Sequence, residues 1–196
     1  MINENFIYLG ILLNSIGSIS YIIDTVKGKV KPNRVTFFLW ALAPLIIFFS
    51  EIKQGVGMQS LLAFVVGFWP LLTLLASFVN KKAEWKITKF DIICGILSLV
   101  GLVLWLITKV GNIAIIFGII ADLLAALPTI KKSYYYPKTE TIWPYFSGAI
   151  YAGITILTIK TWNFPHYAFP VYLFTANILL TVLIQFDFKK LIRMKV

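Results

Sequence analysis

The chain has 196 residues, of which 59% are hydrophobic and only 13% are charged. A soluble domain of this size needs a more polar surface, so the composition excludes a soluble globular protein. The formal net charge is +10, but the basic residues lie in short segments between apolar stretches that are long enough to cross a bilayer. This clustering is typical of membrane topology, and we expect no nucleic-acid partner.

Seven apolar stretches follow one another along the chain, each close to the roughly 20 residues that cross the hydrocarbon core of a membrane. We predict spanning helices at residues 4–25, 35–51, 58–79, 90–108, 112–132, 142–160 and 166–186. The first stretch lacks a basic amino-terminal region and a small-residue cleavage site, so we interpret it as a helix and not as a signal peptide. The sequence predicts an all-α membrane protein with seven transmembrane helices.

The basic residues predict how these helices are oriented. Fifteen of the eighteen Lys and Arg residues fall in alternate connections and in the C-terminal segment, whereas the opposite set holds only Lys53, Lys109 and Lys160. Cytoplasmic loops carry an excess of Lys and Arg, so we expect the N-terminus outside and the C-terminus in the cytoplasm. The predicted location is the cytoplasmic (plasma) membrane, with lipid as a partner and a homo-oligomer left open.

An internal repeat organises the predicted helices. The first three and the last three coincide when the sequence is shifted by about 105 residues. Three identities then fall in one ten-residue window: Lys27 with Lys132, Pro32 with Pro137, and Thr36 with Thr141. A single connecting helix restores the chain direction, so the two units should be parallel. We predict a 3+1+3 arrangement of triple-helix bundles: a first unit at 1–80, linker helix 4 at 81–110, and a second unit at 111–196.

This architecture resembles the PQ-loop superfamily, which includes the SWEET sugar transporters, cystinosin-type transporters and the KDEL receptor. The second half carries the run 126–130, Ala-Leu-Pro-Thr-Ile, before a basic loop. Pro128 stands at the position of the family's helix 5 proline, while Thr129 replaces the glutamine of the motif. The first half has neither the proline nor the glutamine, so the chain is similar to a divergent member.

The resemblance also implies functional residues. SWEET transporters carry helix prolines, which Pro44, Pro128 and Pro144 match here, and an asparagine of helix 7 that faces the substrate, which Asn177 matches. A proline inside a helix removes one backbone hydrogen bond and bends the helix, which makes these three residues candidate hinges. A static kink that improves packing is the alternative.

Asp122 is the most informative polar residue, because it lies midway along the predicted fifth helix among apolar neighbours. A carboxylate there costs several kcal/mol unless it is protonated, paired or hydrated, so it should point inward. We interpret it as a substrate or proton site. The alternative is a structural hydrogen bond with a neighbouring helix.

A polar stripe marks the predicted first helix, where Asn14, Ser18 and Tyr21 recur at spacings of four and three residues. Such a stripe lines a cavity or joins helices through close contact, and both readings stay open for it and for Asn177. Glu140, like Asp24, lies near a basic loop. Both acids are expected to form inside-surface ion pairs, and the resemblance adds an inside gate as a second role.

No catalytic constellation is evident, since the chain has one histidine and one cysteine and no phosphate-binding glycine motif. We therefore expect no enzyme, cofactor or metal site. The sequence predicts a SWEET-like transporter, a facilitator or a proton-coupled carrier, that moves a small polar solute such as a sugar by alternating access. The alternative is a non-transporting sorting receptor or accessory membrane-binding protein. A carrier needs a cavity that opens to each side in turn, whereas a receptor needs a pocket open to one side.

Overall fold

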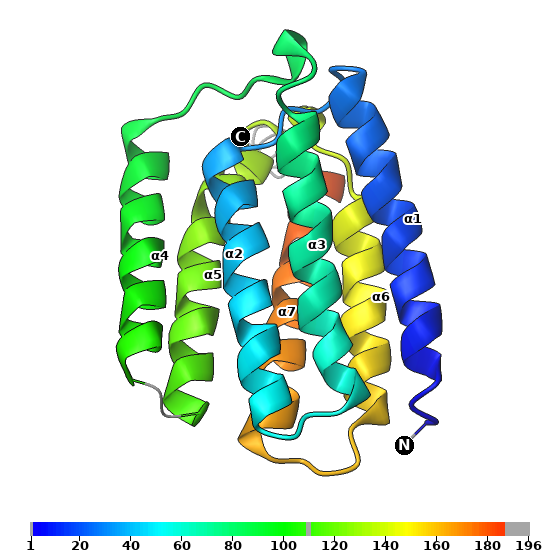
Figure 1. Cartoon of the computed structure of the whole chain (residues 1–196). Coiled ribbons are helices and arrows are strands. Elements are labelled where there is room, and N and C mark those ends of the chain that lie inside the picture. Colours follow the sequence, from blue (N-terminus) through cyan, green and yellow to red (C-terminus); the bar gives the residue numbers. More distant parts are fainter. Residues whose placement is uncertain (1, 109–110, 187–196) are drawn as a thin grey trace, which may run out of the picture.

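The computed structural model describes residues 2–108 and 111–186, and these residues form seven α-helices and no strand (Figure 1). The helices are α1 (Phe6–Val26), α2 (Arg34–Lys53), α3 (Leu61–Ala76), α4 (Lys89–Thr108), α5 (Gly111–Tyr135), α6 (Trp143–Thr158) and α7 (Phe164–Gln185). Three short 3₁₀ turns lie in the connections: Met58–Ser60, Lys81–Ala83 and Pro137–Thr139. The predicted all-helical fold class is confirmed.

Four of the helices are long and apolar enough to cross a membrane. They are α1, α2, α7 and the segment Met58–Ala76, which joins the first 3₁₀ turn to α3. Each predicted span coincides with one observed helix, but α6 has only 16 residues, just under the roughly 17 needed to cross the hydrocarbon core. Membrane crossing by α4, α5 and α6 stays a prediction.

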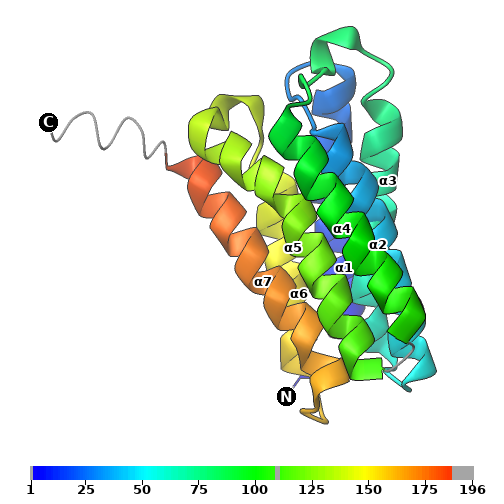
Figure 2. The same cartoon turned by 90° about the vertical axis from the view of Figure 1, so that its left-hand side faces the viewer.

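The helices pack in a regular pattern. α3 contacts both α1 and α2, and α7 contacts both α5 and α6. The first three helices meet the last three mainly through two pairs, α1 against α6 and α2 against α5, with a smaller contact between α3 and α6. α4 lies at one edge of the bundle, against α5 and more lightly against α2 (Figures 1 and 2). The hydroxyl of Ser98 in α4 donates to the carbonyl oxygen of Ala121 in α5 at 2.6 Å and joins these two helices.

One end of the bundle collects the basic side chains. The α1–α2, α3–α4 and α5–α6 connections all lie at this end (Figure 1), which we call the basic end. Of the basic residues predicted to share one side, those from Lys27 to Lys138 lie here, whereas the C-terminal four are outside the described residues. Asn33 begins α2 at this end, because its side chain accepts from the backbone N–H groups of Val35 and Thr36.

Large apolar side chains cover the outer faces of the helices. On α4 the exposed ones follow helical spacing: Ile92, Ile93, Ile96, Leu97, Val100 and Val103. On α1 they include Phe6, Leu9, Leu12, Ile16, Ile19 and Ile23. Continuous apolar surface of this extent is costly in water and fits a lipid environment.

The α1–α6 contact depends on glycines. A Cβ atom at Gly17 would lie 2.1 Å from Ser147 Oγ and 2.6 Å from the carbonyl oxygen of Trp143, and one at Gly10 would lie 2.4 Å from the ring of Tyr151. Only glycine permits this approach of the two helices without a backbone shift.

We therefore expect Gly17→Ala to destabilise the protein by about 1–3 kcal/mol, because the new methyl group must displace the α6 backbone. Gly153→Ala is the matched control, since its Cβ would meet only the ring of Phe174 at 3.4 Å, an ordinary contact. Thermal unfolding in detergent measures both variants. Equal melting temperatures for the two would contradict the packing argument.

Candidate functional site in a central cavity

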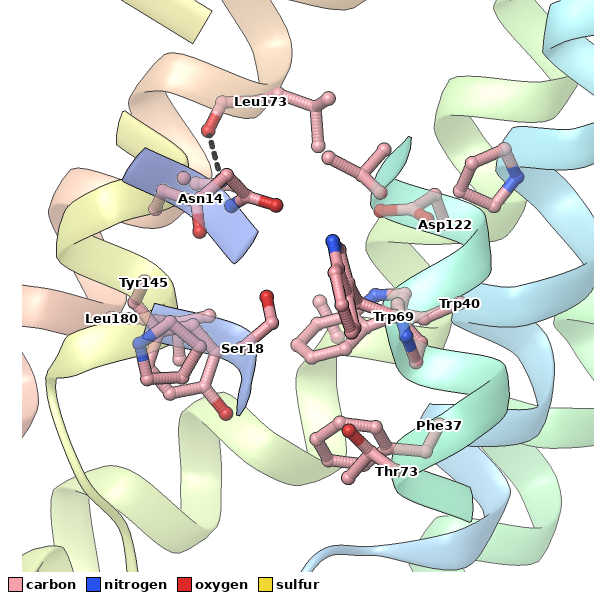
Figure 3. Close-up of a pocket in the computed structure, with 18 of the residues that line it drawn as sticks. Asn14, Ser18, Phe37, Trp40, Trp69, Thr73, Asp122, Tyr145, Leu173 and Leu180 are labelled. Carbon is pink, nitrogen blue, oxygen red and sulfur yellow. Dashed lines mark hydrogen bonds between the residues drawn. The ribbon is translucent and has the colours of Figure 1, made fainter. Parts of the chain in front are cut away.

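A cavity lies between the first three and the last three helices. It includes about 740 Å³ of empty space with its open side counted. All five residues predicted to bind substrate or protons line it: Asn14, Ser18, Tyr21, Asp122 and Asn177. Figure 3 labels Asn14, Ser18 and Asp122 among them. The structure thus brings together residues that lie more than 160 positions apart in the chain.

Asp122 lies in the wall of the cavity that α5 forms. The residue is only 3% exposed, and its carboxyl group accepts a hydrogen bond from the hydroxyl of Tyr172 at 2.7 Å. The indole of Trp40 lies beside the same carboxyl group without meeting hydrogen-bond geometry. Asp122 therefore faces inward as expected, and its observed partner is a neutral donor on α7.

The polar stripe of α1 faces the cavity as well. Asn14, Ser18 and Tyr21 are all buried and lie on the wall that α1 contributes; Figure 3 labels the first two. Thr73 and Trp69 of α3 complete this side. Of the two readings of the stripe, helix packing and cavity lining, the structure supports both, since Gly17 on the same helix makes the close contact with α6.

Asn177 lies across the cavity on α7. Its side-chain N–H donates to the carbonyl oxygen of Leu173 in the preceding helical turn at 2.9 Å. The amide packs against Gly148 of α6, where a Cβ atom would lie 3.0 Å from Asn177 Oδ1. The glycine therefore makes room for the amide at the cavity wall.

The predicted hinge prolines separate into three cases. Pro44 lies inside α2 and lines the cavity. Pro128 lies inside α5 but does not line the cavity. Pro144 lines the cavity but lies in the first turn of α6, where a proline removes no intrahelical hydrogen bond. The physical basis for a hinge is therefore missing at Pro144, whereas Pro70 of α3 is both inside its helix and in the cavity wall.

A buried ion pair lies between the cavity and the basic end. Lys132 Nζ lies 2.6 Å from Glu140 Oε1, and their side chains are 1% and 0% exposed. The hydroxyl of Tyr21 donates to Glu140 Oε2 at 2.7 Å. The expected ion pair at Glu140 thus exists, but its predicted surface position is wrong because the pair is buried. Asp24 does form a surface pair, with Lys29 at 3.4 Å.

The same group of residues joins the two basic loops. Lys132 Nζ also donates to the carbonyl oxygen of Lys31 in the α1–α2 connection. The backbone N–H of Lys31 in turn donates to the carbonyl oxygen of Thr139 in the α5–α6 connection at 3.1 Å. We call Tyr21, Lys31, Lys132, Thr139 and Glu140 the basic-end network. It ties the first three helices to the last three at this end.

Aromatic rings lie between the network and the rest of the cavity. The centroid of the Tyr21 ring lies 5.4 Å from that of Phe37 and 6.5 Å from that of Tyr145. Trp40 contacts both Phe37 and Tyr145, with centroid distances of 5.6 and 6.3 Å. Since these rings contact one another and the residues also line the cavity, they form its floor toward the basic end.

The opposite end is packed by apolar side chains. A buried cluster there combines residues of five helices: Ile7, Ile47, Leu62, Ala63, Val65, Tyr151, Ala152, Phe169 and Leu173. Gln59 adds a polar link, because its side-chain N–H donates to the carbonyl oxygen of Thr158 at 3.3 Å. The first three and last three helices are therefore in contact at both ends of the cavity.

Sequence reasoning missed several of these residues. Tyr172 and Trp40 lie inside apolar runs, where one aromatic residue gives no signal of its own. Lys132 was grouped with the loop cations, although its neighbour Lys131 is the one that stays outside. Glu51, in the last turn of α2, is only 2% exposed and its Oε2 has no hydrogen-bond partner among the described residues. The sequence signal that could have pointed to Glu51 is a carboxyl group near the end of an apolar stretch.

Comparison with other proteins adds no relative to this picture. No protein-family model matches the chain, and no match was found among curated proteins or solved structures. Within residues 2–108 and 111–186, no group of three His, Cys, Asp or Glu side chains could hold a metal ion. The cavity and the basic-end network are the observations from which a function has to be argued.

The buried ion pair makes a stability prediction. Glu140→Gln leaves the Lys132 cation buried without a counter-charge, so we expect a loss of about 3–5 kcal/mol. The double variant Lys132→Met/Glu140→Gln removes that charge and should recover part of the loss. Thermal unfolding of the purified protein measures both.

The surface pair supplies the control. Asp24→Asn removes the acid of the exposed pair with Lys29, and we expect a change of less than about 1 kcal/mol. A double variant that unfolds at a lower temperature than Glu140→Gln alone would contradict the assignment of a buried, charge-compensated pair.

Proposed function

We propose that this chain is a SWEET-like membrane transporter that moves a small polar solute by alternating access. The observation that carries the proposal is the cavity, in which residues of α1, α5 and α7 selected from sequence chemistry line one space between the first three and last three helices. Polar groups are costly inside a membrane protein unless they serve a pathway or a contact. Here they face a common space between the helices.

The contacts between helices support the 3+1+3 repeat. α3 lies against α1 and α2 as α7 lies against α5 and α6, and α1 meets α6 as α5 meets α2. A two-fold axis along the membrane normal exchanges α1 with α5, α2 with α6 and α3 with α7, and it maps every one of these pairs onto another. In this proposal the triple-helix units are residues 1–80 and 111–196, and α4 in 81–110 is the linker.

The basic end supports the orientation. The connections that carry most of the described Lys and Arg residues lie there (Figure 1), and the positive-inside rule assigns such an end to the cytoplasm. The N-terminus then lies outside, and the protein belongs to the plasma membrane. The basic-end network becomes the cytoplasmic gate, because it joins the two units across the route from the cavity to the cytoplasm.

Alternating access follows from the two contacts between the units. Breaking the network at Glu140 frees the basic end, while the apolar cluster at the opposite end keeps that side closed. Re-forming the network and separating the cluster reverses the access. Pro44 and Pro70 lie inside helices of the first unit beside the cavity, where each removes a backbone hydrogen bond, so they are the hinges that this cycle would use.

A sorting receptor or accessory membrane protein is the competing function, and access to the cavity separates the two. In a Cys94→Ser background the chain has no cysteine, so Ser18→Cys places one thiol in the cavity. We expect a membrane-impermeant maleimide to label it from either side of the membrane, in cells and in inverted vesicles. Glu140→Gln should increase labelling from the cytoplasmic side.

The matched control is Ser98→Cys, whose side chain is buried between α4 and α5 and should stay unlabelled. If the Ser18→Cys thiol reacts from one side only, with and without the Glu140→Gln change, the receptor is the correct reading and the carrier is not.

Proton coupling makes a separate prediction. Asp122 is the only carboxyl group among the residues that line the cavity, so Asp122→Asn keeps its shape but cannot exchange a proton. In proteoliposomes offered a library of labelled metabolites, we expect the variant to lose accumulation driven by a pH gradient and to keep exchange at equal pH. Asp24→Asn is the control. Unchanged gradient-driven uptake in Asp122→Asn would contradict proton coupling through Asp122.

A further inference from the structure

The cavity carries a charge and an aromatic content that select among polar solutes. We infer that it binds a small organic cation, with Asp122 as the counter-charge and aromatic side chains as part of the wall. This inference rests on the proposed function, because it names the substrate class of the same cavity. Its evidence is the identity of the lining residues and the contacts of Asp122.

The charge of the lining is one-sided. Asp122 is its carboxyl group, and among the described residues that line the cavity there is no Lys, Arg or His. Lys132 lies beyond the basic end of the cavity, but its Nζ is paired with Glu140 Oε1 at 2.6 Å. Tyr21, which donates to the same glutamate, lies between this pair and the cavity. An anionic solute would therefore meet a carboxylate with no cation to offset it, which is unfavourable at low dielectric. A cationic solute would meet an attractive partner.

The polar neighbours of Asp122 can donate hydrogen bonds to a carboxylate. The hydroxyl of Tyr172 donates to one oxygen at 2.7 Å, and the indole of Trp40 lies beside the same group. The indole is a donor only, and the hydroxyl is directed as a donor in this structure. Donors arranged in this way stabilise a carboxylate, and a cation completes its coordination.

Aromatic side chains supply part of the wall. Six of them line the cavity: Tyr21, Phe37, Trp40, Trp69, Tyr145 and Tyr172. The faces of such rings attract ammonium groups, and an aromatic cage with one carboxylate is a recurring way to bind them without full hydration. A sugar would need many hydrogen-bond partners, whereas the polar lining beside Asp122 is limited to Asn14, Ser18, Thr73, Asn177 and the tyrosine hydroxyls.

The test compares cations with neutral molecules of the same shape. Choline is paired with 3,3-dimethylbutan-1-ol and ethanolamine with propan-1-ol, and glucose is added as an uncharged polyol. Binding to the purified full-length chain in detergent is followed by tryptophan fluorescence, since Trp40 and Trp69 line the cavity, and by ligand-induced thermal stabilisation. We expect at least one of the cations to bind at least tenfold more tightly than its neutral counterpart.

Two variants connect that preference to the site. Asp122→Asn should remove the preference for the cation while the protein keeps its fold, and Asp24→Asn should leave it unchanged. Trp69→Leu should weaken cation binding several-fold with little effect on the neutral molecule. Equal affinity of each cation and its neutral counterpart, a preference that survives Asp122→Asn, or binding of glucose without either cation would overturn the inference.

The outcome is separable from that of the transport experiments. Selective cation binding without uptake into proteoliposomes supports the ligand class and contradicts the transporter. Uptake of a neutral solute without cation binding supports the transporter and overturns the ligand class.

Discussion

The structure depends on one constraint: inside an apolar shell, a polar group must find its partner within the protein. The outer faces of α1 and α4 are covered with large apolar side chains, so the polar atoms turn inward. Tyr172 donates to Asp122, Tyr21 donates to Glu140, and Lys132 pairs with the same glutamate. The cavity and the network that closes it are the two places where these inward-facing groups gather.

The same constraint explains why much of the candidate site could be predicted from the sequence. A carboxyl in the middle of an apolar helix has few acceptable directions, so Asp122 could be assigned to the interior without coordinates. Asn14, Ser18 and Tyr21 share a face because their spacing follows the helical turn. Helix positions were predictable for an equally simple reason, since each apolar stretch ends at polar or turn-forming residues.

The sequence could not predict the contacts that depend on tertiary packing. Lys131 and Lys132 are adjacent and chemically identical, yet Lys131 lies over the ring of Phe90 while Lys132 is buried beside Glu140. The rotation of α5 decides between them, and that rotation is set by packing against α2, α4 and α7. The role of Tyr172 was not predictable for a similar reason. A single tyrosine in an apolar run gives no sign that its hydroxyl donates to Asp122 on another helix. Pro144 shows the reverse error, in which a matching residue lies one turn away from the helix interior that a hinge requires.

Two contacts between the basic loops use main-chain atoms of Lys31. Its backbone N–H donates to the carbonyl oxygen of Thr139, and its carbonyl oxygen accepts from the side chain of Lys132. Main-chain atoms are present whatever the side chain, so most substitutions in the two loops leave that junction intact, proline at position 31 being the exception. An inserted or deleted residue, by contrast, moves the donor away from its acceptor. Apart from positions whose side chains are used, such as Asn33 and Glu140, the two loops can therefore change in composition more easily than in length.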